Sequence, residues 1–198
     1  MDDWTLASCR QEYTSTGLHE DDLAHDPFAQ FRGWLAQARA AGIWEPNAMV
    51  LATAGADAAP SSRMVLLKGL GDDGFRFFTN YESRKGTDLD HNARCSLLFP
   101  WHPLERQVRV EGVAVRLDAA DSDDYFAARP RGAQVGAWAS RQSRVVPDRQ
   151  ALDDGYAAVG ARWPEAVPVP RPEYWGGYCV QPEQVEFWQG RSHRMHDR

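Results

Sequence analysis

The sequence predicts a mainly β fold with flanking helices, an α+β chain built around a small antiparallel barrel. Short β-prone runs separated by turn residues fill the middle of the chain, and helical patterns flank them on both sides. A length of 198 residues suits one domain with a sizeable core. We find no internal repeat, low-complexity tract or linker in the sequence, so one domain is expected.

An arm and a helix are expected first. Residues 1–25 are polar without a sustained period and predict an amino-terminal arm, which leaves residues 26–198 as the single domain. Asp26 suits an N-cap, Pro27 the first helical position and Gly42 the carboxyl-terminal stop. The core face predicted for this helix consists of Phe28, Phe31, Leu35 and Ala38.

A meander of antiparallel strands is expected next. The β-prone runs are residues 49–53, 63–67, 75–79, 95–99 and 107–117. Residues 71–74 (Gly-Asp-Asp-Gly) predict a tight connection, and Gly112 interrupts the longest run as a bulge or a barrel corner would. Because closing the strands on themselves would remove their exposed edges, we expect a barrel.

Helical patterns return in the second half of the chain. They cover residues 121–128, 132–140 and 148–163, after a short helix from residue 83 to 89. Four prolines between residues 164 and 172 mark the loop that follows. Two final strands, 174–180 and 184–188, are expected on either side of a turn-like break at residues 181–183 (Gln-Pro-Glu).

Charge and composition exclude several classes of function. A formal net charge of -6 gives no long-range attraction for nucleic acid or anionic lipid, so phosphates must bind at local cationic clusters. The three cysteines, Cys9, Cys95 and Cys179, contain no Cys-x-x-Cys pair and predict neither a disulfide framework nor a zinc site. The acidic amino terminus has no apolar segment, and no apolar run could span a bilayer, so we expect a soluble, cytoplasmic protein.

Familiar catalytic motifs are absent from the sequence. No Gly-x-Gly-x-x-Gly follows a strand, and neither a Walker loop nor a Gly-x-Ser-x-Gly elbow occurs, which argues against nucleotide folds and hydrolases. His193 and His196 have no third ligand at a recognisable spacing, so no metal site is predicted.

Three cationic clusters could bind phosphate. Arg63 and Lys68 bracket an apolar run, but alternation along a regular strand would place them on opposite faces, so they need a bulge or serve different ligands. Arg84 and Lys85 stand at a predicted helix start, where an anion is favoured. Taken alone, the first pair is better explained as surface charge beside a core strand, and the second pair is explained equally well as a solvated helix terminus.

The third cluster lies on a predicted helix. Tyr125 and Arg129 are four residues apart and would share one face, where a phenol and a guanidinium can grip a phosphate. An ordinary stacking pair explains them at least as well when no other information is used. Gln107, Gln142 and Ser143 are single polar residues and are uninformative individually.

Read together, several separated motifs resemble the pyridoxine (pyridoxamine) 5'-phosphate oxidases, the flavin enzymes that make pyridoxal phosphate. The matching segments are residues 63–68, 125–130, 142–143 and 187–198, and the resemblance runs from about Arg10 to the last residue. It implies a split barrel, FMN as cofactor, and a homodimer with FMN at the interface. The implied reaction oxidises pyridoxamine or pyridoxine 5'-phosphate with dioxygen and yields hydrogen peroxide.

The resemblance also implies roles for single residues. Arg194 would position and polarise the substrate as the main catalytic residue, with support from His196, and Arg10 and Tyr13 would belong to a mobile lid. The implied substrate-binding residues are Arg10, Tyr13, Lys68, Tyr125, Arg129, Ala133, Arg194 and His196. The implied flavin-binding residues are Arg63, Met64, Val65, Leu66, Leu67, Lys68, Phe78, Thr79, Arg84, Lys85, Gln107, Gln142, Ser143, Trp188 and Arg198.

Two departures from the family pattern stand out. Ala133 occupies the position of a family serine that joins the phosphate grip, and the family continues past Arg198 with a further strand. Either the sequence is truncated there or the barrel closes differently.

Two other functions remain open. One is a related FMN oxidase of another metabolite, of the phenazine-pathway type, which would lack the grip of Lys68, Tyr125 and Arg129. The other is a non-catalytic protein that binds flavin or pyridoxal phosphate.

Overall fold

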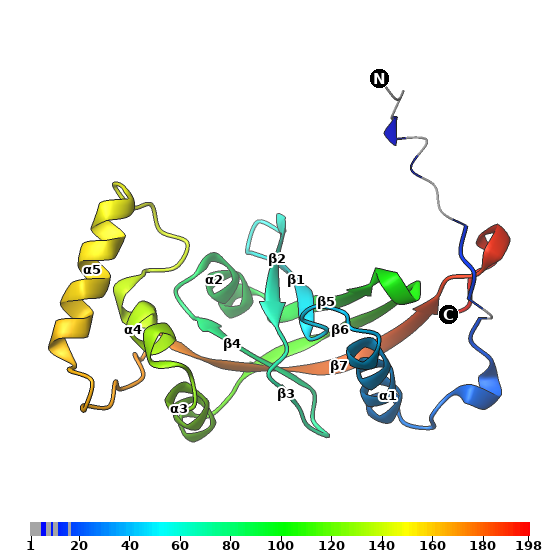
Figure 1. Ribbon diagram of the computed structural model, residues 1–198, viewed down its shortest axis with the longest axis horizontal. Coiled ribbons are helices and arrows are strands. Elements are labelled where there is room, and N and C mark those ends of the chain that lie inside the picture. The colour runs from blue at the N-terminus through cyan, green and yellow to red at the C-terminus, as the bar shows by residue number, and fades with distance from the viewer. Residues whose placement is uncertain (1–4, 7–8, 10–11, 16) are drawn as a thin grey trace.

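A single antiparallel sheet organises the protein, shown in Figure 1 as a computed structural model. The structure describes residues 5–6, 9, 12–15 and 17–198. In this part of the chain, seven strands pair in the order β2-β1-β5-β6-β7-β4-β3. Their bounds are β1 Ala48–Ala54, β2 Pro60–Leu66, β3 Gly69–Leu70, β4 Phe75–Asn80, β5 Arg94–Trp101, β6 Arg106–Arg116 and β7 Trp175–Gln189.

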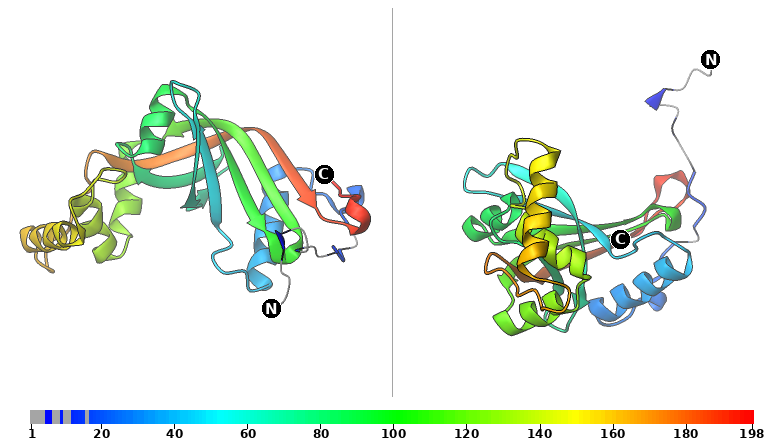
Figure 2. Two further views of the ribbon diagram at one scale, coloured as in Figure 1. Left: turned by 90° about the horizontal axis from the view of Figure 1, so that it is seen from above. Right: turned by 60° about the vertical axis from the view of Figure 1, so that its left-hand side comes forward.

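The sheet curls into a half-barrel (Figure 2). The mainly β fold with flanking helices is confirmed, and β2 and β3 are the two ends of the strand order. One end is a strand of only two residues, Gly69–Leu70, and so short an edge offers little backbone for pairing with another chain. The expected tight turn before β4 is confirmed, with Gly71 N–H donating to Gly74 O at 3.1 Å.

Helix α1, Pro27–Ala40, covers one side of the sheet as predicted. The Asp26 carboxylate accepts hydrogen bonds from the amides of Phe28 and Ala29, which satisfies two donors at the helix start. Phe31 is fully buried, with its ring 5.0 Å from Phe75 and 4.8 Å from Phe99. The core face also contains Trp34, which the predicted pattern did not include.

Four further α-helices flank the sheet in the described part of the chain. They are α2 Arg84–His91, α3 Ala119–Ala127, α4 Arg131–Ala139 and α5 Arg149–Arg162, each within two residues of its predicted start. Helices α4 and α5 pack together at the end of the molecule opposite the carboxyl terminus (Figures 1 and 2). A second apolar cluster, formed by Phe126, Val135, Val169 and Trp175, joins this end to the sheet.

The last strand corrects one prediction. β7 runs unbroken from Trp175 to Gln189, so the expected turn at residues 181–183 is wrong. Gly112 pairs with Pro182 while Glu111 pairs with Gln184, which leaves Glu183 as the extra residue of a bulge. This bulge confirms the predicted irregularity at Gly112. A side chain does not fit there, because a Cβ at Gly112 would lie 2.1 Å from Gln181 O. Proline signals a turn and a bulge alike, because it lacks the N–H of a regular ladder.

All three cysteines lie among the residues that the structure describes. Cys9 is exposed and Cys95 and Cys179 are buried, and all three are free. Burial raises the pKa of Cys95 to about 12 and that of Cys179 to about 11, so both thiols stay protonated at neutral pH. None of the helices in the described ranges has the length and apolar character needed to cross a bilayer.

Candidate functional site

A cavity of about 810 Å³ opens between β2, the start of α2, and helices α3 and α4. It is lined by five cationic side chains and, among the described lining residues, by no carboxylate. This concentration of positive charge occurs in a chain whose net charge is -6, as expected for a local anion site. The predicted residues that line it are Arg63, Met64, Val65, Leu66, Lys68, Phe78, Thr79, Arg84, Lys85, Tyr125, Arg129, Ala133, Gln142 and Ser143.

Strand β2 resolves the question of Arg63 and Lys68. The strand ends at Leu66, so Lys68 lies in the connection to β3, where alternation along β2 no longer fixes its direction. Both cations therefore line the same cavity without a bulge between them. Leu67, another predicted flavin contact, is buried in the main core.

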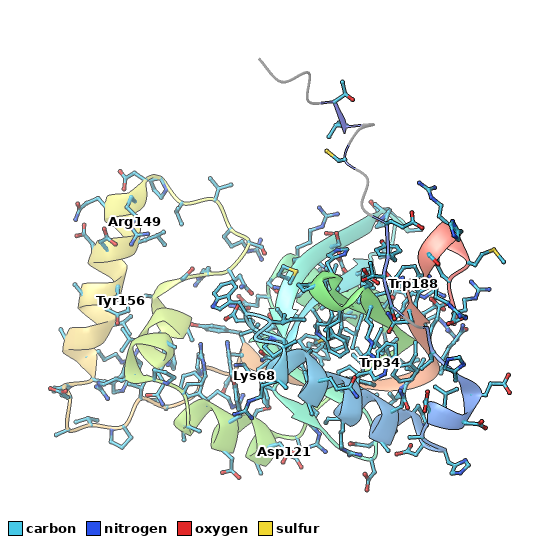
Figure 3. The ribbon with its side chains drawn as sticks, turned by 45° about the vertical axis from the view of Figure 1, so that its right-hand side comes forward. Trp34, Lys68, Asp121, Arg149, Tyr156 and Trp188 are labelled. Atoms are coloured by element: carbon cyan, nitrogen blue, oxygen red, sulfur yellow. The ribbon has the colours of Figure 1, made fainter. Side chains whose placement is uncertain are left out.

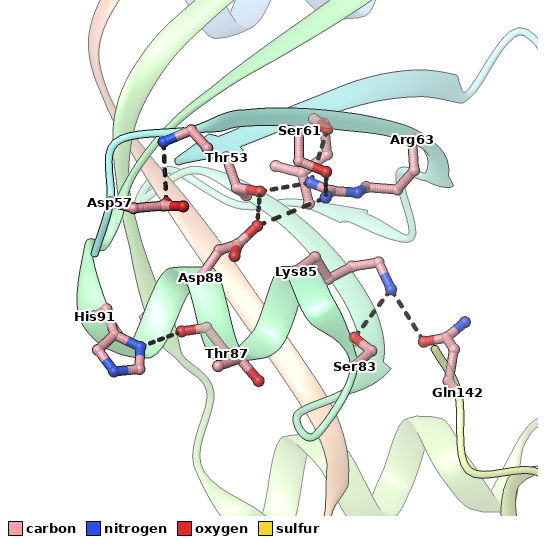
Figure 4. A network of polar contacts seen from close by, with 12 residues as sticks. Thr53, Asp57, Ser61, Arg63, Ser83, Lys85, Thr87, Asp88, His91 and Gln142 are labelled. Carbon is pink, nitrogen blue, oxygen red and sulfur yellow. Dashed lines mark hydrogen bonds and ion pairs between the residues drawn. The ribbon is translucent and has the colours of Figure 1, made fainter. Parts of the chain in front are cut away.

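The Arg63 guanidinium is held by a polar network (Figure 4). It donates to Thr53 Oγ1 and to Ser61 Oγ, both at 2.6 Å, and lies 3.7 Å from an Asp88 carboxylate oxygen. Asp88 also accepts from Thr53 Oγ1 at 2.7 Å. Burial lowers the pKa of Arg63, Asp88 opposes that shift, and the result is a cation fixed in place at the cavity wall.

Lys85 is the most deeply buried cation of the cavity. Its ammonium donates to Ser83 Oγ and to Gln142 Oε1, each at 3.0 Å (Figure 4). Burial, and then repulsion from Arg63, lowers the pKa of Lys85 to about 8. Gln142 Oε1 also accepts from Thr79 Oγ1 at 3.3 Å, so three predicted flavin contacts form one connected group.

Aromatic rings support Tyr125 and Arg129. Tyr125 stacks on Phe78 with ring centroids 3.9 Å apart. Helix α3 ends at Ala127, so Arg129 lies in the turn before α4 instead of on the predicted helix face. Its guanidinium carbon is 4.5 Å from the centroid of the Trp175 ring, and its buried Nη1 has no hydrogen-bond partner among the residues that the structure describes.

A second group of predicted residues lies at the other end of β7. In the β6–β7 register Gln107 pairs with Trp188, whose ring is 4.6 Å from that of His196. Tyr13 lies across both rings, at 5.9 Å from Trp188 and 5.4 Å from His196. We call Tyr13, Gln107, Trp188, Arg194, His196 and Arg198 the carboxyl-terminal group.

The backbone of the tail is unusual at the predicted catalytic residue. His193 and Arg194 both have positive φ, 56° and 59°, a strained conformation for side-chain-bearing residues and one that is frequent at functional sites. The Arg194 side chain is exposed. His196 Nδ1 accepts from the Arg191 amide at 3.1 Å, so the neutral imidazole carries its proton on Nε2. Arg198 is exposed and lies 3.8 Å from Glu186.

Hydrogen bonds to Glu105, just before β6, and to Asp197, near the carboxyl terminus, hold the amino-terminal arm in place. The Glu105 carboxylate accepts from the amides of Thr14 and Ser15 at 3.0 Å, and Asp197 accepts from Leu18 at 2.8 Å. These contacts hold the segment that carries Tyr13 beside Trp188. Arg10, the other residue predicted for the lid, lies outside the described residues.

One chain does not bring the two groups together. Trp175 at the cavity and Trp188 in the carboxyl-terminal group stand near opposite ends of β7, separated by roughly 40 Å of strand at the usual rise per residue. In Figure 3 the labelled residues Lys68 and Trp188 lie in separate regions of the molecule. The chain thus presents a cationic cavity at one end of its sheet and an aromatic and imidazole surface at the other.

The sequence analysis did not identify two residues that support the cavity, Trp175 and Asp88. Trp175 looks like an ordinary core aromatic at the start of a strand, and Asp88 looks like a solvated helix residue. The burial of both, and their contacts with Arg129 and Arg63, depend on tertiary structure. The Tyr-Trp-Gly-Gly run was the available signal at Trp175, because paired glycines allow close approach of another segment.

The chain is similar to known proteins over most of its length. Residues 35–161 match the family model described as pyridoxamine 5'-phosphate oxidase, and residues 175–198 match the pyridoxine 5'-phosphate oxidase C-terminal dimerisation region. Pyridoxine/pyridoxamine 5'-phosphate oxidase from a Nocardioides species is 60% identical, over 98% of this chain and 90% of that protein. The protein of the same name from Salinibacter ruber is 56% identical over the same shares.

Solved structures show the same fold. PhzG from Burkholderia lata 383, in complex with tetrahydrophenazine-1-carboxylic acid, superposes with a TM-score of 0.83 at 35% identity, covering 89% of this chain and 86% of that one. A pyridoxamine 5'-phosphate oxidase-related, FMN-binding protein from Nostoc punctiforme has a TM-score of 0.66 at 16% identity, covering 87% and 89%. The split barrel is confirmed, and the extent of these matches shows that the chain belongs to the pyridoxamine 5'-phosphate oxidase family.

Proposed function

We propose that this protein oxidises pyridoxamine 5'-phosphate and pyridoxine 5'-phosphate to pyridoxal 5'-phosphate, with FMN as cofactor and dioxygen as acceptor. The observation that carries this proposal is the cavity itself. It contains five cationic side chains, no described carboxylate and one buried guanidinium N–H group without a partner. Such a donor set suits ligands that bear phosphate, and both FMN and the proposed substrates bear one.

The cavity residues fit the cofactor. Arg63, Arg84 and Lys85 would hold the FMN phosphate near the first turn of α2, where backbone N–H groups also favour an anion. Met64, Val65 and Leu66 supply an apolar wall for the ring, and the Gln142 amide supplies polar contacts to its edge. When bound, FMN supplies a two-electron carrier between substrate and dioxygen.

The substrate phosphate is assigned to Lys68, Tyr125 and Arg129, which line the same cavity. Arg194 would orient the pyridine ring and polarise it, and His196, with its proton on Nε2, would donate a hydrogen bond to the substrate. Positioning of the reacting carbon dominates this role, because misplacement by about 1 Å costs roughly a hundredfold in rate.

In both proposed reactions two hydrogen atoms pass from the substrate to dioxygen. Pyridoxine 5'-phosphate loses two hydrogen atoms from its C4′ alcohol, and dioxygen gains them as hydrogen peroxide. Pyridoxamine 5'-phosphate also consumes one water molecule and releases ammonia as the C4′ amine becomes an aldehyde. The protein groups align the C4′ carbon and exclude competing geometries.

We propose further that the working form is a homodimer with FMN at the subunit interface. The cavity and the carboxyl-terminal group lie at opposite ends of β7, and the strand and tail from Trp175 to Arg198 match a dimerisation region. A second copy of the chain would bring its tail to the cavity of the first. The free, buried thiols suit a reducing compartment, so we place the protein in the cytoplasm.

A related oxidase of another metabolite is the second candidate. The likeness to PhzG, with its TM-score of 0.83, favours it. Ala133 also favours it, because this position lines the cavity and adds no hydroxyl donor to the phosphate grip. The presence of Lys68, Tyr125 and Arg129 around the cavity argues for the phosphorylated substrate. A non-catalytic flavin or pyridoxal phosphate binding protein is the third candidate.

An oxygen-consumption assay on FMN-loaded protein tests the proposal. We expect turnover with pyridoxine 5'-phosphate, matched release of hydrogen peroxide, and much weaker turnover with unphosphorylated pyridoxine. Turnover of a reduced tricyclic carboxylate together with none of either vitamin form would favour the second candidate. Binding of the phosphorylated ligand without any oxygen consumption would favour the third.

A further inference from the structure

We propose that Trp175 is a positioning residue, which holds the side chains of Arg129 and Tyr125 in the orientation that binds the substrate phosphate. This inference rests on the proposed function, because it assigns a role to a residue behind the proposed phosphate grip. Trp175 is the first residue of β7, is buried, and lines the cavity.

The contact with Arg129 holds the guanidinium without using its donors. The guanidinium carbon lies 4.5 Å from the centroid of the Trp175 ring and 5.4 Å from that of Phe126. A cation held over aromatic faces keeps its N–H groups free for a ligand. Arg129 Nη1 is buried and has no hydrogen-bond partner among the described residues, as expected of a donor kept for an anion.

Arg131, two residues further on, shows the alternative arrangement. Its guanidinium donates to the carbonyl oxygens of Trp163, Pro164 and Val167, at 2.6, 2.8 and 2.9 Å. That arginine fixes the proline-rich loop and has its donors engaged by the protein. Arg131 therefore uses its donors to stabilise the fold, whereas the buried Nη1 of the nearby Arg129 is left available for a ligand.

The same indole also supports Tyr125. The two rings are nearly parallel, with an interplanar angle of 4° and centroids 6.2 Å apart. Phe78 is stacked on Tyr125 at 3.9 Å and lies 5.8 Å from Trp175. Two of the three residues of the proposed grip, Tyr125 and Arg129, therefore pack near Trp175, and a change in the shape of this ring should shift both.

The backbone at Trp175 is fixed independently of its ring. Its N–H donates to Pro172 O at 3.0 Å, and its carbonyl accepts from Arg171 Nη1 at 2.7 Å. A Trp175→Phe substitution therefore leaves these contacts in place and changes mainly the ring under Arg129.

The test measures binding of two ligands that differ only in phosphate. 4-Deoxypyridoxine 5'-phosphate and 4-deoxypyridoxine lack the group to be oxidised, so calorimetric titration of FMN-loaded protein records binding without turnover. We expect Trp175→Phe to weaken the phosphorylated ligand by about fivefold to thirtyfold, the range of a desolvated cation–π contact. Affinity for the unphosphorylated ligand and for FMN should stay within about twofold.

A double-mutant cycle with Arg129→Ala separates positioning from a general structural role. If Trp175 acts through Arg129, Trp175→Phe has little further effect on phosphate binding once Arg129 is gone. Trp138→Phe is the matched control, since this indole packs 4.9 Å from Trp163 and does not line the cavity. It should alter thermal stability without changing the preference for phosphate. Trp175→Tyr replaces the Phe variant if the latter does not fold.

Equal weakening of both ligands by Trp175→Phe, or full additivity with Arg129→Ala, would overturn the inference. The parent protein and Trp175→Phe could show the same preference for the phosphorylated ligand. That result would contradict the role of Trp175 but would not contradict the proposed function. Selective loss of phosphate binding in a protein that never consumes oxygen supports Trp175 and defeats the proposed oxidase activity. A parent without any preference for the phosphorylated ligand contradicts both.

Discussion

The cavity and the carboxyl-terminal group are built in opposite ways. Arg63 and Lys85 in the cavity are at least half-buried and held by hydrogen bonds within the same chain. Arg194 and Arg198 in the tail are exposed, and the rings of Trp188 and His196 are half-buried. The cationic cavity is therefore organised within one chain, whereas the carboxyl-terminal group leaves its two arginine side chains exposed.

Burial also sets the electrostatic character of the two regions. Desolvation lowers the pKa of Arg63, Lys85 and Arg129, so an arriving phosphate restores favourable charge pairing. The tail shows positive φ at His193 and Arg194 instead, a conformation that costs of order 1–3 kcal/mol per residue. We interpret the cavity as a site that is preorganised to bind phosphate, and the carboxyl-terminal group as one that aligns the substrate.

The largest effect is expected at the tail. Arg194→Ala should leave the affinity for FMN unchanged and lower turnover by about a hundredfold or more, because the reacting carbon is no longer aligned. Stopped-flow measurement of flavin reduction isolates this step. A reduction rate equal to that of the parent protein would remove Arg194 from the assigned role.

The second effect belongs to the cavity. Lys85→Ala should weaken FMN by about 1.5–3 kcal/mol, the range for a hydrogen bond to a charged group, which is roughly tenfold to 150-fold in Kd. Fluorescence titration measures it, and riboflavin serves as the control because it lacks the phosphate. If FMN and riboflavin lose affinity equally, Lys85 does not contact the phosphate.

The pH dependence of FMN binding sharpens the same assignment. The pKa of Lys85 is about 8 in the protein without ligand, and a bound phosphate dianion raises it. Between about pH 7 and pH 8 Lys85 is mostly charged with or without FMN and the phosphate is mostly a dianion, so affinity changes little. Above that pH, binding must take up a proton and Kd rises by up to about tenfold per pH unit. Lys85→Met should bind FMN more weakly at neutral pH but without this rise.

The stability of the protein without FMN should respond to pH in the opposite direction. The folded pKa of Lys85 lies below its ordinary value of 10.5, so the unfolded chain binds more protons between about pH 8 and that value. The cost of burying this ammonium is present at neutral pH and disappears as the pH rises through the window. Urea denaturation of the parent and of Lys85→Met at several pH values measures the difference.

The smallest effect is expected at Ala133, which lines the cavity near Arg129. Ala133→Ser adds a hydroxyl donor, and competition with water limits the gain to a few-fold lower KM for pyridoxine 5'-phosphate. KM for unphosphorylated pyridoxine and the affinity for FMN should not change. An equal effect on both substrates would show that this face of α4 does not contact the substrate phosphate.

Much of the fold could be predicted because its signals are local. The cap at Asp26, the turn at residues 71–74 and the irregularity at Gly112 follow from residue chemistry that tertiary context left intact. The unbroken β7 could not be predicted, because Pro182 in a bulge and Pro182 in a turn give the same sequence signal.

The candidate site was less predictable from the residues alone. Arg63 and Lys68 share a cavity because β2 ends between them, and that end is set by the pairing of β2 with β1. Arg129 reaches the cavity from a turn, and the burial of Trp175 beneath it is a tertiary contact. Residue types indicated phosphate chemistry, while the separation of the two groups along β7 appears only in three dimensions.

A heterodimer of two defective chains tests most directly whether the two regions meet across an interface. One chain carries Arg194→Ala and the other carries Lys68→Ala with Arg129→Ala, and two different affinity tags allow the mixed dimer to be isolated after co-expression. If cavity and tail come from different copies, one of the two sites in the mixed dimer is intact, and it should show about half the activity of the parent dimer. Activity no higher than that of the two defective homodimers would contradict the account, because both groups would then have to come from the same chain.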